Sequence, residues 1–232
     1  MKRAFVFVAS AVAVASSADA GILGFAAFSR TASNGNKVVD LVAVSNSATD
    51  KVLNAFNVQT SSTFIQLAGA ATRGFKPDAA SSTRSNIVDS FCTIGVDGGA
   101  PYEGQYYASG ATGADGGFTS GWTTLGTTMP TNAGWFVSPP TLPDGASESL
   151  ANFTGNRVNS NAGAAAGNFG IWLGHWVFAA GTTSARISLT ISAQVGGQTV
   201  TASVTNFEQI PAPGAIALLG IAGVAGSRRR RA

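Results

Sequence analysis

The chain has few of the side chains that carry chemistry. Its 232 residues include one cysteine and one histidine. A single cysteine cannot form a disulfide within the chain, so the fold must depend on its hydrophobic core. A zinc site of the usual Cys and His ligands lacks enough ligands here, and we expect neither a metal nor another cofactor.

The motifs of the common enzyme classes are also absent. The chain contains no Gly-x-Ser-x-Gly, no P-loop and no dinucleotide fingerprint. Asp97, Glu103 and Asp115 lie near a Gly-rich segment, as candidates for a glycosidase pair or for calcium ligands. They lack the Asp-x-Asp-x-Asp order of a calcium loop, which favours solvated loop acids. We therefore predict no catalytic residue, and a glycoside-active enzyme is our third hypothesis.

The single cysteine and the single histidine both lie in strand-like patterns. Cys92 belongs to the run Ile87–Val96, where a small buried hydrophobic side chain is the simplest interpretation. His175 lies in the apolar run Phe169–Phe178, which favours a hydrogen-bonded interior histidine. A catalytic pair of the two would need a thiolate in an electropositive, accessible site, which this pattern does not predict.

Charge is scarce and unevenly placed. The sequence pI is about 9.4, but six of the 14 basic residues lie at the two ends of the chain. Between residues 21 and 210, eight Lys and Arg face ten Asp and Glu, a net charge of −2. A body without a basic surface lacks the main electrostatic term for phosphate contacts. We expect no nucleic-acid partner.

The first twenty residues have the three parts of a signal peptide. Met1-Lys2-Arg3 is basic, Ala4 to Ala15 is apolar, and Ala18 and Ala20 form an Ala-x-Ala site. This order predicts a signal helix, export, and cleavage by signal peptidase after Ala20.

The last residues form a second sorting segment. A Pro-marked break at Pro211, Ala212, Pro213 and Gly214 is followed by the apolar run 214–226. As a helix of 13 residues, that run would span about 20 Å of a hydrocarbon core of about 30 Å, which favours transient inner-membrane insertion. The basic end predicts retention of the last residues in the cytoplasm; it consists of Arg228, Arg229, Arg230 and Arg231.

Residues 210–232 resemble the PEP-CTERM sorting signal, which has a Pro-Glu-Pro motif, an apolar helix and an arginine cluster. The chain departs from it at Ala212, where the family has Glu. The resemblance implies processing by an exosortase near 211–214, in an outer-membrane-bearing bacterium that makes exopolysaccharide. It also implies that the product is at the cell surface or in the extracellular matrix. A plain single-pass anchor with a basic end is the alternative.

Residues 21–209 read as one domain built of strands. Arg186–Ser192 alternates polar and apolar residues, and Gly196-Gly197 predicts a hairpin turn before the next strand. Many short strands with Gly, Ser and Asn turns predict an all-β, antiparallel β-sandwich or jelly-roll-like domain. The runs with strand patterns are 37–45, 52–58, 63–67, 87–96, 135–138, 168–179, 185–195 and 199–207, with short strands near 105–107 and 118–119 inside the Gly-rich segment 95–121.

The most specific binding hypothesis concerns the tryptophans. Strict alternation puts Trp172 and Trp176 on one face of a strand, with Phe178 and the open backbone of Gly174. They would lie about 13 Å apart and form a platform on which sugar rings stack. The other aromatic candidates for this platform are Trp122, Trp135, Tyr102, Tyr106 and Tyr107. The alternative is that these side chains fill the core between two sheets.

The sequence as a whole predicts an exported structural protein of the cell surface or extracellular matrix, linked to exopolysaccharide. A carbohydrate-binding module that uses Trp172 and Trp176 is the alternative.

Overall fold

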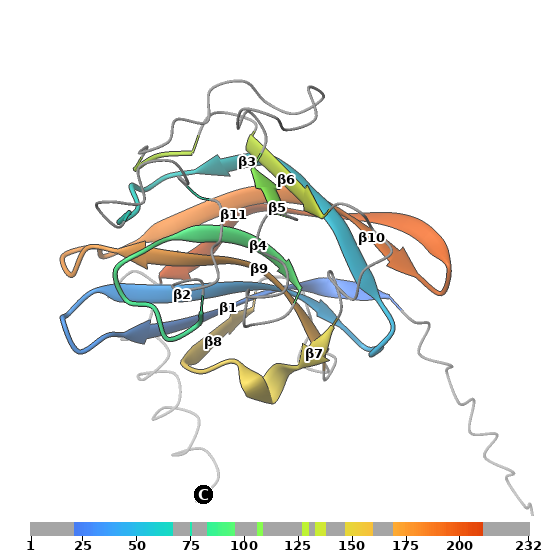
Figure 1. Cartoon of the computed structure of the whole chain (residues 1–232), viewed down its shortest axis with the longest axis horizontal. Coiled ribbons are helices and arrows are strands. Elements are labelled where there is room, and N and C mark those ends of the chain that lie inside the picture. Colours follow the sequence, from blue (N-terminus) through green and yellow to red (C-terminus); the bar gives the residue numbers. More distant parts are fainter. Residues whose placement is uncertain are drawn as a thin grey trace, which may run out of the picture.

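The structure, a computed structural model, describes residues 21–66, 75, 83–95, 106–108, 127–129, 133–137, 147–159 and 169–210. Within these residues, every element is a β-strand except a 3-10 helix of one turn, η1 (Leu150–Asn152). All strand pairs are antiparallel, which confirms the prediction of an all-β, antiparallel protein. The expected signal helix and sorting helix lie outside the described residues (Figure 1).

The first sheet contains six strands, in the order β4-β9-β2-β1-β8, with the short β7 also paired to β9. Its strands are β1 (Ile22–Thr31), β2 (Lys37–Ser45), β4 (Phe91–Gly95), β7 (Glu148–Ser149), β8 (Asn156–Asn159) and β9 (Phe169–Phe178). The second sheet contains five strands, in the order β11-β10-β3-β6-β5. Its strands are β3 (Lys51–Thr60), β5 (Tyr106–Ala108), β6 (Ala133–Val137), β10 (Ala185–Val195) and β11 (Gln198–Ile210).

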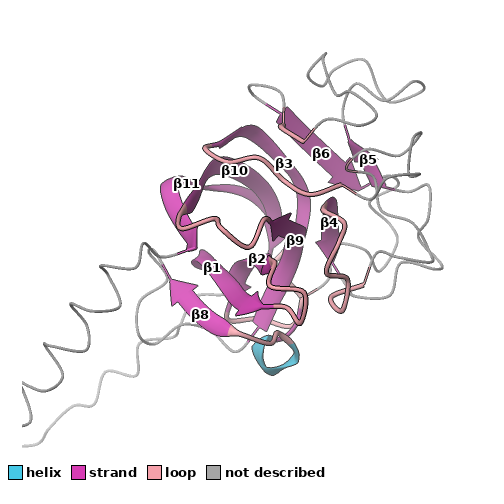
Figure 2. Ribbon diagram, turned by 90° about the vertical axis from the view of Figure 1, so that its left-hand side faces the viewer, coloured by secondary structure: helices cyan, strands magenta, loops and turns pink. Residues whose placement is uncertain are grey.

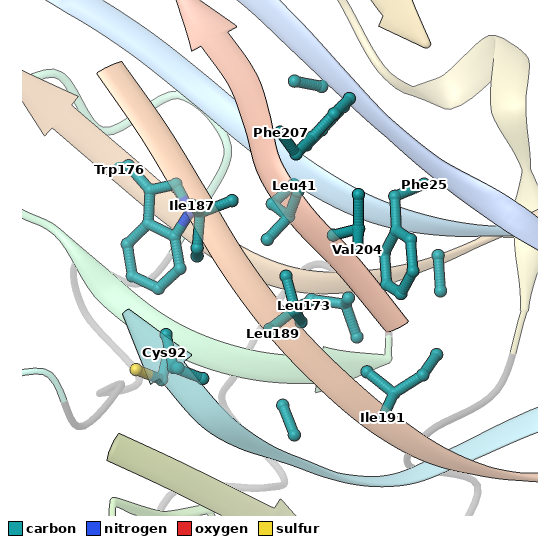
Figure 3. Packing of buried hydrophobic residues seen from close by; sticks show 14 of the residues in the cluster. Phe25, Leu41, Cys92, Leu173, Trp176, Ile187, Leu189, Ile191, Val204 and Phe207 are labelled. Carbon is teal, nitrogen blue, oxygen red and sulfur yellow. The ribbon is translucent and has the colours of Figure 1, made fainter. Parts of the chain in front are cut away.

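The two sheets share one hydrophobic core. Figure 2 shows β10, β3 and β6 above β1, β2 and β9, and buried side chains from both sets belong to a single cluster. Each large apolar side chain buried in this way contributes about 1.5–3 kcal/mol to folding. The labelled members in Figure 3 are Phe25, Leu41, Cys92, Leu173, Trp176, Ile187, Leu189, Ile191, Val204 and Phe207.

A second, smaller cluster forms on the opposite side of the six-stranded sheet. It is composed of Ala26, Phe28, Val42, Val44, Phe91, Leu150, Phe153 and Trp172. Leu150 of η1 and Phe153 just after it supply part of its cover, so the segment 147–153 lies against this side of the sheet. Several strands of the six-stranded sheet are therefore buried on both faces.

The β10-β11 hairpin follows the sequence pattern closely. The odd-numbered residues of β10 are buried and the even-numbered residues are exposed or half-buried, as a half-buried strand requires. Gly196 (φ 54°) and Gly197 (φ 81°) connect the strands with two left-handed residues, the geometry of a tight hairpin turn. The predicted hairpin is confirmed.

Two strand predictions differ from the structure. The run 63–67 is not a strand in its described part, although Phe64 N–H donates to the Thr127 carbonyl (2.7 Å) and Ile65 N–H to the Val177 carbonyl (2.7 Å). The run 87–96 becomes a strand only at Phe91, because the Asn86 side chain accepts the backbone N–H groups of Val88 and Asp89 and holds a turn there.

The strand β1 was not predicted. Phe25 and Ala27 face the large core, whereas Ala26 and Phe28 face the smaller cluster. A strand buried on both faces shows no alternation of polar and apolar residues, so its sequence lacks the usual signal.

Candidate functional site

The tryptophan platform predicted from the sequence does not exist. Trp172 and Trp176 retain 1% and 0% of their accessible surface, so neither ring can stack on a sugar. They also lie on opposite faces of the sheet, since Trp176 belongs to the large core and Trp172 to the smaller cluster. Trp135 is equally buried, and its indole N–H donates to the Thr93 carbonyl (3.0 Å).

A β-bulge separates the two tryptophans. On β2, the neighbours Leu41 and Val42 pair with Gly174 and Trp172, which leaves Leu173 as an extra residue on β9. An extra residue reverses the alternation of faces beyond it. The prediction that Trp172 and Trp176 share a face assumed a regular strand, and it is wrong for this reason.

Gly174 does not leave open backbone between the tryptophans. A Cβ atom at this position would lie 2.2 Å from Cζ2 of Trp176, well inside van der Waals contact. The Trp176 indole therefore occupies the space that any larger residue at 174 would need.

The side chains with the strongest chemistry gather instead on the face that carries the smaller cluster. Asp40 on β2 and His175 on β9 are direct cross-strand partners, and both are completely buried. The carboxylate of Asp40 accepts a hydrogen bond from Nη1 of Arg30 (2.9 Å), and its other oxygen lies 2.7 Å from Nδ1 of His175. A cation, a carboxylate and an imidazole thus form one line across β1, β2 and β9.

The imidazole of His175 has no free nitrogen. Its Nε2 donates to the backbone carbonyl of Asn86 (2.9 Å), while Nδ1 faces the Asp40 carboxylate. The Phe91 ring stacks on the imidazole with centroids 5.0 Å apart and planes at 18°. Since both nitrogens and one ring face are occupied, His175 holds strands together and is not placed to accept a proton from a ligand. The prediction of a hydrogen-bonded interior histidine is confirmed.

Arg84 contacts the segment 147–153 on the face of the six-stranded sheet that carries the smaller cluster. Its guanidinium lies 4.2 Å from the centroid of the Phe153 ring and 4.9 Å from that of Trp172, within the range of cation–π contact. It forms an ion pair with Glu148, whose carboxylate also accepts the side-chain amide of Asn152 (2.9 Å). The Arg84 carbonyl accepts a hydrogen bond from Arg30. This bond joins the Arg84–Glu148 ion pair to the Arg30–Asp40–His175 line in one network.

Cys92 is buried on the opposite side of this sheet. It is 2% exposed and belongs to the large core, which confirms the interpretation as a buried hydrophobic side chain. Its Cα pairs with Gly174, beside His175, yet the sheet separates the thiol from the imidazole. A Cys–His nucleophile is excluded by this arrangement.

No known protein family, curated protein or solved structure matches this chain. Among the described residues, no group of three or more His, Cys, Asp or Glu side chains is arranged to hold a metal ion. The same part of the chain contains no helix long and apolar enough to span a membrane.

The predicted sorting residues lie outside the described residues. This applies to Ala18 and Ala20, to Pro211, Ala212, Pro213 and Gly214, and to Arg228, Arg229, Arg230 and Arg231. It applies also to the loop acids Asp97, Glu103 and Asp115, and to Tyr102 and Trp122. Tyr106 and Tyr107 lie on β5, where Tyr107 pairs with Phe136 of β6.

Sequence reasoning missed the charged network. The network forms no motif because its residues come from three separate segments of the chain: Arg30 and Asp40 from the paired strands β1 and β2, Arg84 from the turn before β4, and Glu148 from β7. One signal was present in the run Lys37–Ser45, where Asp40 is the only acid among Val, Leu and Ala residues. A lone carboxylate inside a strand buried on both faces needs a buried partner, because burial of an unpaired charge is costly.

The buried thiol of Cys92 should be unreactive in the folded protein. Burial raises the pKa of the Cys92 thiol well above its usual 9.0, and only the thiolate reacts with thiol reagents. We expect the native chain at pH 8 to resist a chromogenic disulfide reagent and to react fully in denaturant. The neutral thiol also favours the folded state, a contribution present below about pH 9 and lost as the pH rises further.

A matched control for this experiment is Gln59→Cys, which adds a thiol at an exposed position of β3. The added thiol should react at once while Cys92 stays protected. Native labelling of Cys92 at the rate seen in denaturant would contradict the prediction.

Proposed function

We propose that this chain is an exported structural protein of the cell surface or extracellular matrix. Signal peptidase would remove residues 1–20, and an exosortase would process the tail near 211–214. The domain between them is, on this proposal, an antiparallel β-sandwich of the jelly-roll kind, since two antiparallel sheets share a single core. Exopolysaccharide is the matrix that the resemblance of the tail implies.

One observation carries the structural role. The side chains best suited to chemistry, His175 and Cys92, have structural roles. Both imidazole nitrogens have partners within the protein, the Asp40 carboxylate and the Asn86 carbonyl, and the thiol is buried in the core. In an active site such groups face a space that a substrate can enter. In this domain His175 links strand β2 to a loop and Cys92 fills the core, which supports a structural role.

The carbohydrate-binding alternative loses its basis at Trp172 and Trp176. Both rings are packed inside the protein, so their replacement would damage the fold before it changed any contact with a glycan. We do not retain a glycan site at these two residues.

The test is the mass and location of the natural product. In the cells that make it, we expect the surface or extracellular fraction to contain a chain that begins at Gly21 and lacks Arg228, Arg229, Arg230 and Arg231. Replacement of Pro211 and Pro213 by Ala should leave the tail uncut. The control Ala212→Glu creates the Pro-Glu-Pro of the family and should be processed at least as completely as the natural chain.

A cytosolic product with intact Met1 and an uncut arginine end would overturn the proposal. So would tail processing that is unaffected by the loss of both prolines.

A further inference from the structure

The strand β11 presents the longest edge of either sheet among the described residues. It is outermost in the five-stranded sheet and pairs only with β10. The other edge strands are shorter: β4 has five residues, β8 has four and β5 has three. The second half of β11 is covered, with Phe207, Gln209 and Ile210 buried.

The first half of β11 is exposed and regular. Seven consecutive pairs, from Leu189↔Val204 to Val195↔Gln198, join it to β10 without a shift of register. Most of its side chains are exposed, and Val200 is one of two exposed large apolar side chains in the described part of the chain. Figure 1 shows this hairpin at the right-hand edge of the molecule. Its outer backbone groups therefore have no strand partner among the described residues.

This edge lacks the usual protection. Natural edge strands carry charges, proline or bulges that prevent pairing with another chain. Residues 198–204 read Gln-Thr-Val-Thr-Ala-Ser-Val, with no charge, no proline and no glycine. The bulge of β11 comes only after them, near Asn206 with its φ of 52°. A neutral segment of six or seven residues with high β-propensity is the kind that pairs with a copy of itself.

The sequence of this segment is complementary to itself about Thr201. In an antiparallel pair of two copies centred there, Thr199 faces Ser203 and Val200 faces Ala202 of the other copy. Residues that face each other across an antiparallel pair point to the same side of the sheet. Hydroxyl groups therefore meet hydroxyl groups on the outer side, and on the inner side Val200 meets Ala202 while, at the ends of the segment, Gln198 faces Val204.

The outer side already contains one contact of this kind within the chain. Thr190 Oγ1 and Ser203 Oγ form a hydrogen bond of 2.9 Å between β10 and β11. The second copy would continue this row of hydroxyl groups across the new pair. No like charges would meet, because neither copy has a charged residue between 198 and 204.

We propose that β11 is an interface at which two copies of this chain join edge to edge, antiparallel and two-fold symmetric about Thr201. The two five-stranded sheets then form one continuous sheet, and the exposed Val200 of each copy is covered by the other. The pairing depends on the strand and not on the tail, so it can fail or hold independently of export and processing.

The first experiment measures the mass of the chain in solution, in the form isolated from the cells that make it. We expect the mass of a dimer that dissociates on dilution. Thr201→Lys should weaken association at least tenfold, because two lysines would meet on the axis, whereas an equimolar mixture of Thr201→Lys and Thr201→Glu should regain the dimer. The matched control Gln59→Lys changes an exposed residue of β3, in the same sheet but away from the edge, and should leave the dimer intact.

The second experiment fixes the register without a change of charge. Thr201→Cys should form an intermolecular disulfide under mild oxidation, since the two positions face each other across the axis. Thr199→Cys should not, because its two copies would lie about 13 Å apart along the strands. Cys92 is buried and does not interfere.

The proposal is overturned by a monomer at all concentrations, by a dimer that Thr201→Lys leaves unchanged, or by equal cross-linking at 199 and 201. A monomer whose amides at 198–204 resist hydrogen exchange would show that another segment of the same chain covers the edge, and it would equally overturn the proposal.

Discussion

Asp40→Ala should lower the free energy of unfolding by about 3–5 kcal/mol, the cost of removing one partner from a buried ion-paired group. Asp40 is completely buried and bonds both Arg30 and His175, so its loss leaves a cation and an imidazole without their acceptor. Since small domains are stable by only about 5–15 kcal/mol, this single change removes a large part of the total. Urea denaturation followed by tryptophan fluorescence would measure it.

An exposed ion pair provides the control for this prediction. Arg186 and Glu208 lie 3.8 Å apart on β10 and β11, and their side chains are 54% and 32% exposed. Because water and side-chain entropy offset such pairs, Glu208→Ala should cost less than about 1 kcal/mol. Equal losses of unfolding free energy for Asp40→Ala and Glu208→Ala would show that the buried network stabilises the fold no more than an exposed ion pair does.

The double variant Asp40→Leu/His175→Phe tests whether the cost of losing Asp40 comes from its contact with His175. The double variant removes the carboxylate and the imidazole together, so neither is left facing a lost partner, whereas Arg30 and the Asn86 carbonyl each lose a bond in the corresponding single variant and in the double variant alike. It should therefore cost clearly less than the sum of the two single changes. Phe91 already stacks on the ring of His175 and can pack on a phenyl ring in its place. Additive costs would contradict a direct coupling between the carboxylate and the imidazole.

The parts of the fold that the sequence predicts are those encoded locally. Val195, Gly196 and Gly197 end a strand and turn the chain within a few residues, and the alternation in β10 shows directly which side is buried. The same reasoning cannot detect strand β1, because Ala26 and Phe28 are buried on one face and Phe25 and Ala27 on the other. Alternation of polar and apolar residues reveals a strand only when one of its faces is exposed, and this sheet is covered on both faces.

The candidate site was predictable only in part, for two physical reasons. The bulge at Leu173 depends on how β9 pairs with β2, and the sequence of β9 alone does not determine that pairing. The network around Asp40 assembles residues separated by ten to 135 positions, so only the isolated acid in an apolar strand indicated it. Local patterns therefore predict which residues are buried more securely than they predict which side chains meet.

Trp176→Ala should destabilise the domain by about 3–5 kcal/mol, the range for truncation of a buried aromatic side chain. The Trp176 ring is central among the aromatic residues of the large core. Ring centroids lie 5.4 Å away in Phe64, 6.0 Å in Trp135 and 6.5 Å in Phe75, which come from three separate segments of the chain. Removing the indole leaves a cavity where these segments meet, and thermal unfolding would measure the loss.

A pair of phenylalanine variants separates the indole ring from its N–H group. Among the described residues, the buried Nε1 of Trp176 has no hydrogen-bond partner, whereas Nε1 of Trp135 donates to the Thr93 carbonyl (3.0 Å). Trp176→Phe removes an unsatisfied donor together with some volume, while Trp135→Phe removes similar volume and also the hydrogen bond to the Thr93 carbonyl. We therefore expect Trp176→Phe to be the milder of the two. The reverse order would mean that the Trp176 N–H has a partner, and a Trp176→Ala variant as stable as the natural chain would contradict its place in the core.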